Sequence, residues 1–176
     1  YVLAIGVSDY RDSKLKLGYA AEDARDFARI ISLQKGLAYR DVIVKSLTDK
    51  EATQENIRRG LDWIEKSAKG VDVAMVFVAG HGVDDAEGSY YFLPHDADAA
   101  RLKSTGVQYA DFRKTLASIP ALTYLFIDTC HSGDALGRPG RPSTDTTRII
   151  NDLSSAENGI VVFASSTGDQ VSYENP

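Results

Sequence analysis

The stretch Val73–Ala79 (VAMVFVA) is almost unbroken apolar sequence, and it runs directly into Gly80–Gly82 (GHG), which has His81 at its centre. Apolar runs of this length are typical of a central parallel strand that is covered on both faces. The run is too short to cross a bilayer, which needs about 20 apolar residues. We therefore predict a buried strand in the middle of a sheet, a histidine just past its carboxyl end, and no association with a membrane.

Strand and helix patterns alternate on both sides of this run. Expected strands lie at 2–7, 41–47, 71–79, 89–93, 122–127 and 160–164, and expected helices at 20–33, 53–68, 109–116 and 149–156. In the first helix, the spacing of Ala24, Phe27, Ile30 and Ile31 predicts one buried face. The alternation, without an internal repeat, predicts an α/β domain with a mostly parallel central sheet and helices on both faces.

The composition is that of an ordinary globular domain. The chain has 176 residues, of which 43% are apolar, and a net charge of −5, which argues against a nucleic-acid partner. Its single cysteine excludes an intrachain disulfide and a zinc site built on several thiolates, and we expect a cytoplasmic protein. Because the chain opens on Tyr1 without an initiator methionine or signal peptide, we expect a piece of a longer protein with further domains.

Reactive side chains directly follow two of the predicted strands. His81 lies just after the strand at 71–79, and Cys130 comes soon after the strand at 122–127. The carboxyl ends of parallel strands meet at one edge of the sheet, where such sheets bind their ligands. We therefore predict that Cys130 is a thiol nucleophile and that His81 is its base. The N–H groups of Gly82 and Cys130 are the candidates for an oxyanion hole.

Other interpretations of these residues remain open. A lone cysteine after a strand is usually a small buried residue, and a histidine between glycines is usually a loop residue. A zinc site from His81, Asp128, Cys130 and His131 is possible in residue type, although its spacing matches no common zinc pattern. We expect the side chain of His131 to point away from that of its neighbour Cys130.

The two segments resemble those of the caspase–metacaspase superfamily. Phe77–Gly82 resembles its histidine loop, and Asp128–Gly133 resembles the cysteine loop of metacaspases and their bacterial relatives more than that of caspases. Leu17–Ala24 resembles the entry to the first helix of that branch. The caspase signature places its histidine roughly 50 residues before its cysteine, and His81 and Cys130 match this spacing. The resemblance implies a caspase-like three-layer sandwich and a cysteine endopeptidase.

The resemblance also implies a substrate preference. Asp23 and Asp128 match the two acids of the metacaspase specificity pocket, whereas Ala20 and Ala79 replace polar pocket residues of some metacaspases. Ser172 and Glu174 lie in the segment that pairs with substrate in caspases, and Glu174 replaces the caspase arginine. Carboxylates attract a guanidinium or ammonium group, so we predict protein or peptide substrates cleaved after Arg or Lys.

Alternatives to this preference also stay open. Asp23 has a purely structural interpretation as a residue that caps its helix and favours the helix dipole. An Asp-specific peptidase and a non-catalytic interaction module are the alternative functions.

Within one peptidase domain at 1–176, the resemblance implies a large-subunit-like part at 1–136, a linker at 137–148 and a small-subunit-like part from 149. Candidate sites of self-cleavage are Arg138, Arg141 and Arg148, although a solvated loop explains this segment equally well. The chemistry needs no cofactor. Calcium is a possible activator, and its candidate ligands are the loop acids Asp84, Asp85, Asp96 and Asp98, for which solvated turns are the alternative.

Overall fold

A parallel five-stranded ladder forms the centre of the domain in the computed structural model, which describes residues 1–131 and 160–165. The strands of this ladder lie in the order β2-β1-β3-β6-β7, and each pair is parallel. Their bounds are β1 Val2–Gly6, β2 Val44–Thr48, β3 Val73–Asp84, β6 Leu122–His131 and β7 Ile160–Ala164. The run at 73–79 is thus the central strand, as the sequence predicted.

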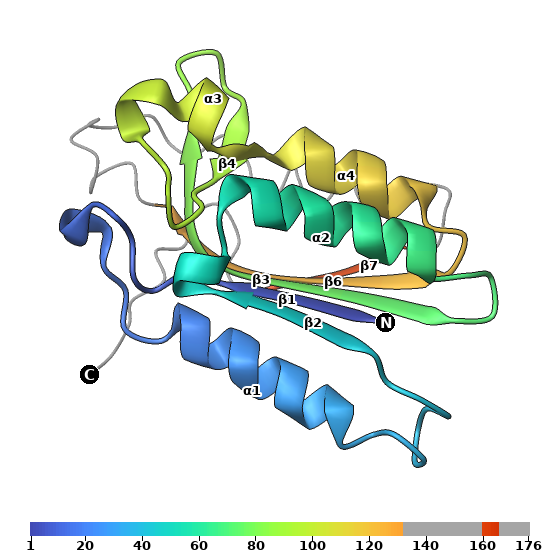
Figure 1. Cartoon of the computed structure of the whole chain (residues 1–176). Coiled ribbons are helices and arrows are strands. Elements are labelled where there is room, and N and C mark those ends of the chain that lie inside the picture. The colour runs from blue at the N-terminus through green and yellow to red at the C-terminus, as the bar shows by residue number, and fades with distance from the viewer. Residues whose placement is uncertain (132–159, 166–176) are drawn as a thin grey trace.

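Helices cover both faces of the sheet (Figure 1). Helix α1 (Ala20–Ser32) lies on one face, and α2 (Gln54–Ser67) and α4 (Tyr109–Ser118) lie side by side on the other. Thr53 caps α2, because its hydroxyl accepts the N–H of Asn56 at 3.2 Å. The predicted α/β fold with helices on both faces is confirmed. The predicted helix at 149–156 lies outside the described residues.

Several short elements escaped the sequence patterns. They are the 3-10 helices Ser13–Leu15, Asp49–Glu51 and Ala99–Arg101, helix α3 (Leu102–Thr105) and strand β5 (Val107–Gln108). Strand β4 (Tyr90–Phe92), which was expected, pairs antiparallel with the end of β3 and with β5. This small antiparallel extension lies beyond the carboxyl end of β1.

The two central strands are longer than predicted. Strand β3 continues through His81 because its last three residues pair with β4, and β6 continues to His131 because it pairs with Gly80–Gly82. Gly80 has φ +147°, a conformation open to glycine, and the strand passes through it without ending. The prediction that His81 and Cys130 lie in loops past the strand ends was therefore wrong. Both residues lie inside paired strands.

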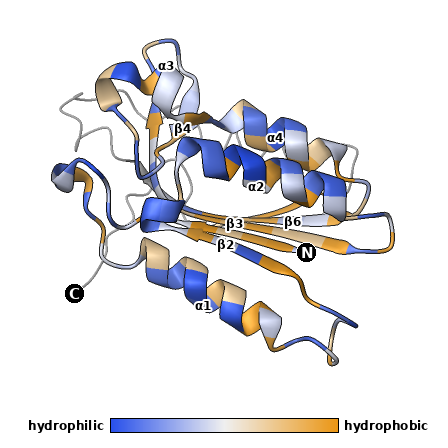
Figure 2. Ribbon diagram, viewed as in Figure 1, coloured by the Kyte–Doolittle hydropathy of each residue, from blue (hydrophilic) through white to orange (hydrophobic). Residues whose placement is uncertain are grey.

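Hydrophobic residues concentrate in the strands, while the outer faces of α2 and α4 are polar (Figure 2). Helix α1 approaches the sheet through small residues, since Ala24 and Ala28 are buried in a cluster with Ala4. Ile30 is 51% exposed, so its predicted place in the buried face was wrong. None of the helices in the described ranges combines the length and the apolar character needed to cross a membrane.

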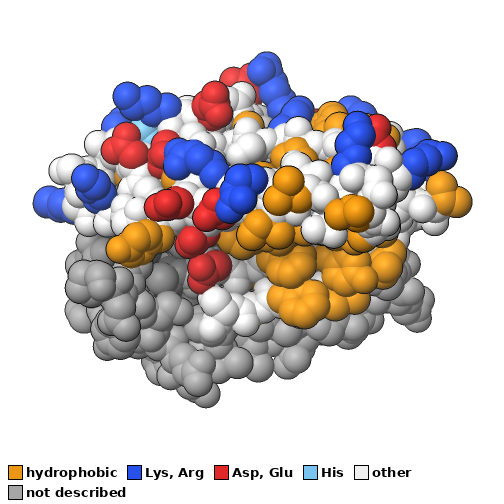
Figure 3. Space-filling view, turned by 90° about the horizontal axis from the view of Figure 1, so that it is seen from below, with side chains coloured by type: hydrophobic (Ala, Val, Ile, Leu, Met, Phe, Trp, Pro, Cys, Tyr) orange, Lys and Arg blue, Asp and Glu red, His pale blue; other side chains and the backbone are white. Residues whose placement is uncertain are grey.

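Aromatic side chains cover the sheet beside α1. Phe27 of α1 contacts Phe77 of β3 and Phe126 of β6, and Phe126 stacks on Phe163 of β7 with 4.9 Å between ring centroids. Phe163 is half exposed. The space-filling view from this side shows hydrophobic side chains gathered in one patch (Figure 3).

Candidate active site

The β3–β6 ladder brings the predicted nucleophile and base together. Its register runs from Val73 opposite Leu122 to Gly82 opposite His131, and it places His81 directly opposite Cys130. Neighbouring strands lie about 4.8 Å apart, so the two backbones are adjacent. The predicted juxtaposition therefore arises from strand register and not from two loops that happen to meet.

His81 is held by the segment between β1 and α1. Its backbone N–H donates to the hydroxyl of Tyr10 at 2.8 Å, and the two rings lie 5.2 Å apart. Its Nε2 lies 2.9 Å from the carbonyl oxygen of Leu15. A carbonyl can only accept, so Nε2 carries the proton and Nδ1 is the nitrogen that can act as a base. The residue is 6% exposed, so this orientation is fixed in a buried setting.

The segment that holds His81 is itself tied down. The N–H of Leu15 donates to the carbonyl of Asp12 and that of Leu17 to the carbonyl of Ser8, each at 3.0 Å. The N–H groups of Ser8 and Asp9 both donate to Oδ1 of Asp49 at 2.9 Å. These bonds make the position of the imidazole depend on a carboxylate that lies outside the site.

Asp49 joins three parts of the domain. Its second oxygen pairs with Arg25 of α1 at 2.9 Å, and its backbone has φ 49°, a left-handed conformation that Asp and Asn tolerate. Burial raises the pKa of Asp49, but the N–H groups of Asp9 and Ser8 and the guanidinium of Arg25 outweigh burial and hold the pKa below its ordinary value. The folded state therefore favours the charged form of this carboxyl.

We expect Asp49→Asn, which keeps the backbone conformation but loses the charge, to lower the free energy of unfolding by roughly 1–2 kcal/mol at neutral pH. The pKa of Asp49 is lower in the folded than in the unfolded chain, so its stabilisation is present above the unfolded value and lost as pH falls through the folded one. The difference between the two proteins should therefore shrink below about pH 4. Urea unfolding at pH 7, 4 and 3 measures it, and a difference independent of pH would contradict this account.

The acid Asp128 has a partner that the sequence did not reveal. Asp128 of β6 is half-buried, and its Oδ1 accepts the hydroxyl of Ser165, just past β7, at 2.5 Å. The N–H of Ser165 also donates to the carbonyl of Ile127 at 3.0 Å. Asp128 is thus held at the carboxyl edge of the sheet, two residues before Cys130 in the chain.

Asp23 is exposed in the first turn of α1, near the same edge. It is not the helix cap, because the helix begins after Tyr19 and the N–H of Ala21 donates to the hydroxyl of Ser8 at 2.9 Å. The capping interpretation of Asp23 was therefore wrong, whereas its place in the first turn fits the alternative that it favours the helix dipole. The start of α1 lies tightly against β1, since a Cβ on Gly6 would come within 2.3 Å of the carbonyl oxygen of Ala20.

The family follows from comparison with known proteins. A model of the caspase domain matches residues 1–176. The chain belongs to the caspase domain family. Metacaspase-1 of Debaryomyces hansenii is 28% identical over 151 residues, which cover 78% of this chain and 33% of the relative. Metacaspase-1 of Meyerozyma guilliermondii and metacaspase-1A of Aspergillus niger are each 30% identical over 151 residues, covering 78% of this chain and 36% of the relative.

This caspase domain spans about a third of the length of these curated relatives. They are fungal, so a nearer likeness to bacterial members stays a prediction. The crystal structure of protein GSU0716 from Geobacter sulfurreducens matches with a TM-score of 0.58 and 23% identity, covering 74% of this chain and 50% of that one. That likeness concerns the fold alone, and it agrees with the predicted α/β sandwich.

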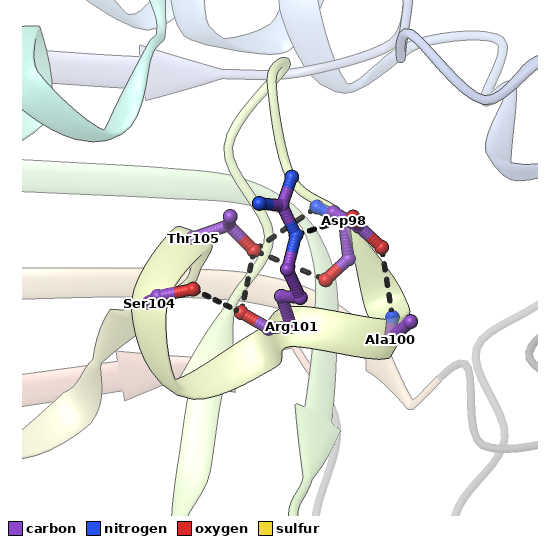
Figure 4. Close-up of polar contacts among 5 residues, drawn as sticks. All are labelled: Asp98, Ala100, Arg101, Ser104 and Thr105. Carbon is purple, nitrogen blue, oxygen red and sulfur yellow. Dashed lines mark hydrogen bonds and ion pairs between the residues drawn. The ribbon is translucent and has the colours of Figure 1, made fainter.

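Three of the four acids considered as calcium ligands have local roles in the caspase domain. Asp85 accepts the N–H groups of Glu87 and Ser89 in the β3–β4 turn, and Asp96 accepts the N–H of Gln54 at the start of α2. Asp98 accepts the N–H of Ala100 and pairs with Arg101 at 2.8 Å (Figure 4). Among the side chains that the structure describes, at 1–129 and 160–165, no three His, Cys, Asp or Glu residues gather as metal ligands would.

The remaining predicted residues lie outside the described part of the caspase domain. They are the substrate-binding candidates Ser172 and Glu174 and the self-cleavage candidates Arg138, Arg141 and Arg148. The residues of the site that the sequence did not indicate are Tyr10, Leu15 and Ser165. Leu15 acts through a backbone carbonyl, which leaves no trace in the residue type, and the others are hydroxyl side chains of common kinds.

Proposed function

We propose that this caspase domain is a cysteine endopeptidase in which Cys130 is the nucleophile and His81 the base. The observation that carries the proposal is the register that places the two residues opposite each other, combined with the proton of His81 fixed on Nε2 by Leu15. A thiol becomes a strong nucleophile when an oriented base can take its proton, and Nδ1 is the nitrogen left for that task.

The reaction follows from these roles. Nδ1 of His81 takes the thiol proton, and Sγ of Cys130 attacks the substrate carbonyl carbon, forming a tetrahedral oxyanion. The N–H groups of Gly82 and Cys130 are the proposed donors to this oxyanion. When the C–N bond breaks, His81 gives its proton to the leaving amine, and a thioester remains. Water, activated by His81, then hydrolyses the thioester and restores the thiol.

The proposed preference for Arg or Lys rests on the charge at the sheet edge. Asp128 is half-buried and held by Ser165, and Asp23 is exposed on α1, whose start lies against the end of β1. A substrate guanidinium can form charge-assisted hydrogen bonds with such carboxylates, whereas a substrate carboxylate would be repelled. The same charges make an Asp preference unfavourable.

We expect Asp128→Asn to lower kcat/KM for peptides ending in Arg by roughly 30- to 100-fold, the loss expected for one charge-assisted contact. Asp26→Asn is the control, because it removes one negative charge from an exposed position of α1, where Asp26 pairs with the exposed Arg29. Fluorogenic peptides ending in Arg, Lys or Asp measure the preference. If wild type and Asp128→Asn cleave Arg peptides equally well, the acidic pocket is contradicted. If wild type cleaves none of the peptides, the alternative of a non-catalytic module is favoured.

The proposal has three further parts. They are self-cleavage after Arg138, Arg141 or Arg148, activation by calcium, and a reducing, cytoplasmic setting. The first is supported by the basic residues of the linker, and the last by the need to keep Cys130 reduced. Calcium is proposed from the acids Asp84, Asp85, Asp96 and Asp98 alone, which do not gather into one set of ligands in the described residues. Mass spectrometry of the purified protein with and without calcium, with Cys130→Ala as the uncleaved reference, tests the first two together.

A further inference from the structure

Tyr90 lies across β3 and β6 at the level of the candidate dyad. It is the first residue of β4, opposite Asp84 in the β3–β4 ladder. Its hydroxyl is hydrogen-bonded to the hydroxyl of Thr129 at 2.8 Å. A Cβ built on Gly82 would come within 1.7 Å of the same hydroxyl oxygen, so the phenol fills the space that a side chain at position 82 would occupy. Tyr90 therefore contacts the residue after His81 and the residue before Cys130.

The contact is made from the α4 side of the sheet. The ring of Tyr90 lies 6.3 Å from that of Tyr109 at the start of α4, and both line a cavity of about 20 Å³ together with Thr129 and Phe112. A cavity of this size holds about one water molecule. Thr129 is 4% exposed, so the Tyr90–Thr129 hydrogen bond is made in a buried setting at the edge of this cavity.

The two halves of the candidate dyad are thus held by different elements. The imidazole of His81 is fixed by Tyr10 and Leu15, which precede α1. The chain just before Cys130 is fixed by the Tyr90–Thr129 bond, which comes from the β4 hairpin. A mechanism that needs the thiol and imidazole in hydrogen-bond contact depends on both restraints.

We propose that Tyr90 is a positioning residue of this peptidase: its hydroxyl, bonded to Thr129 and seated over Gly82, sets the spacing between the strand of His81 and the strand of Cys130. This inference rests on the proposed function. Small displacements of reacting groups reduce turnover strongly while leaving substrate binding nearly intact. The bond between Tyr90 and Thr129 therefore contributes to kcat more than to KM.

The test removes the bond from either end. Tyr90→Phe keeps the ring over Gly82 and deletes only the hydroxyl, and Thr129→Val deletes the partner hydroxyl with little change of shape. Each should lower kcat about tenfold with KM within about twofold, and the double variant should lose no more than the single ones, since one bond is lost in all three. Tyr109→Phe is the matched control, because it deletes the hydroxyl of the neighbouring tyrosine in the lining of the same cavity.

Hydrogen exchange supplies a readout that does not depend on peptidase activity. In Tyr90→Phe and Thr129→Val, amides of the segments 80–84 and 126–131 should exchange faster than in wild type, while those of β1 and β2 should not change. The positioning role is overturned if exchange is unchanged in both variants, or if kcat is unchanged. It is also overturned if the losses in kcat add up in the double variant, or if Tyr109→Phe loses as much kcat as Tyr90→Phe. If wild type cleaves no peptide, the proposed function fails. The positioning role is then decided by exchange and by the alkylation rate of Cys130, which must fall in both variants.

Discussion

Replacement of Cys130 by alanine is expected to reduce turnover of an Arg peptide by at least about a thousandfold, because no other thiol in the chain can replace it. His81→Ala is expected to cause a loss of the same order, since the thiol then lacks the base that the ladder places opposite it. The double variant should be no worse than either single one, because nucleophile and base act as one unit. Peptidase kinetics on proteins shown to be folded by circular dichroism measure these losses.

The single cysteine gives this prediction a second measurement. Iodoacetamide reacts with thiolates, so its rate against pH reports on Cys130 alone. In wild type the rate should rise at lower pH than for free cysteine, and His81→Ala should remove that difference. His131→Ala is the matched control, because its position next to Cys130 in the chain makes it a poor partner for that thiol. Full activity of Cys130→Ala, or equal losses in the two histidine variants, would contradict the assignment.

Gly82→Ala is expected to damage both stability and turnover. The added Cβ would lie 1.7 Å from the hydroxyl oxygen and 2.2 Å from Cζ of Tyr90, so the ring must leave its place. Overpacking of this kind costs about 3 kcal/mol, which corresponds to a fall in melting temperature of roughly 10 °C. Turnover should fall about a hundredfold as the ring gives up its contact with Thr129.

A control and a rescue separate this effect from a general intolerance of alanine. Gly70→Ala should cost much less than Gly82→Ala, since the nearest atom to its new Cβ is the carbonyl oxygen of Pro120 at 3.3 Å, a tight contact but not an overlap. Adding Tyr90→Ala to Gly82→Ala should recover part of the melting temperature, because the clash is gone, without recovering turnover. A melting temperature of Gly82→Ala equal to that of wild type would show that Tyr90 does not occupy this space.

The sequence predicted the order and type of the main elements because their signals are strong and local. Apolar runs identified β3, β6 and β7, and a cap residue identified the start of α2. The extension of β3 through His81 could not be predicted from such local signals, because it depends on pairing with β4 and β6. In addition, the glycines on either side of His81 ordinarily indicate the end of a strand. The exposure of Ile30 was missed because α1 packs on the sheet through Ala24, Phe27 and Ala28. Helical spacing alone does not show that Ala28, and not the larger Ile30, lies on the buried side.

For the candidate site, residue type and position after the strands were enough to select His81 and Cys130. What fixes them could not be found from residue types. The carbonyl of Leu15 determines which nitrogen of His81 carries the proton, and any residue could supply a carbonyl. Tyr90 and Thr129 meet only because the β4 hairpin folds back over Gly82, and Asp128 meets Ser165 only because β6 and β7 are neighbours. These are contacts between segments distant in sequence, with no local pattern to indicate them.

The β3–β4 turn offers a place where the protein can be lengthened. Ala86, Glu87 and Gly88 are exposed at its tip, whereas the ladder that carries His81 and Cys130 is complete without them. An inserted segment at this tip would leave the strand register unchanged and would emerge from the end of the hairpin that extends β3 beyond His81. The turn is therefore suited to accepting a recognition loop or an affinity tag, and variation in its length can alter which proteins reach the site while the chemistry stays the same.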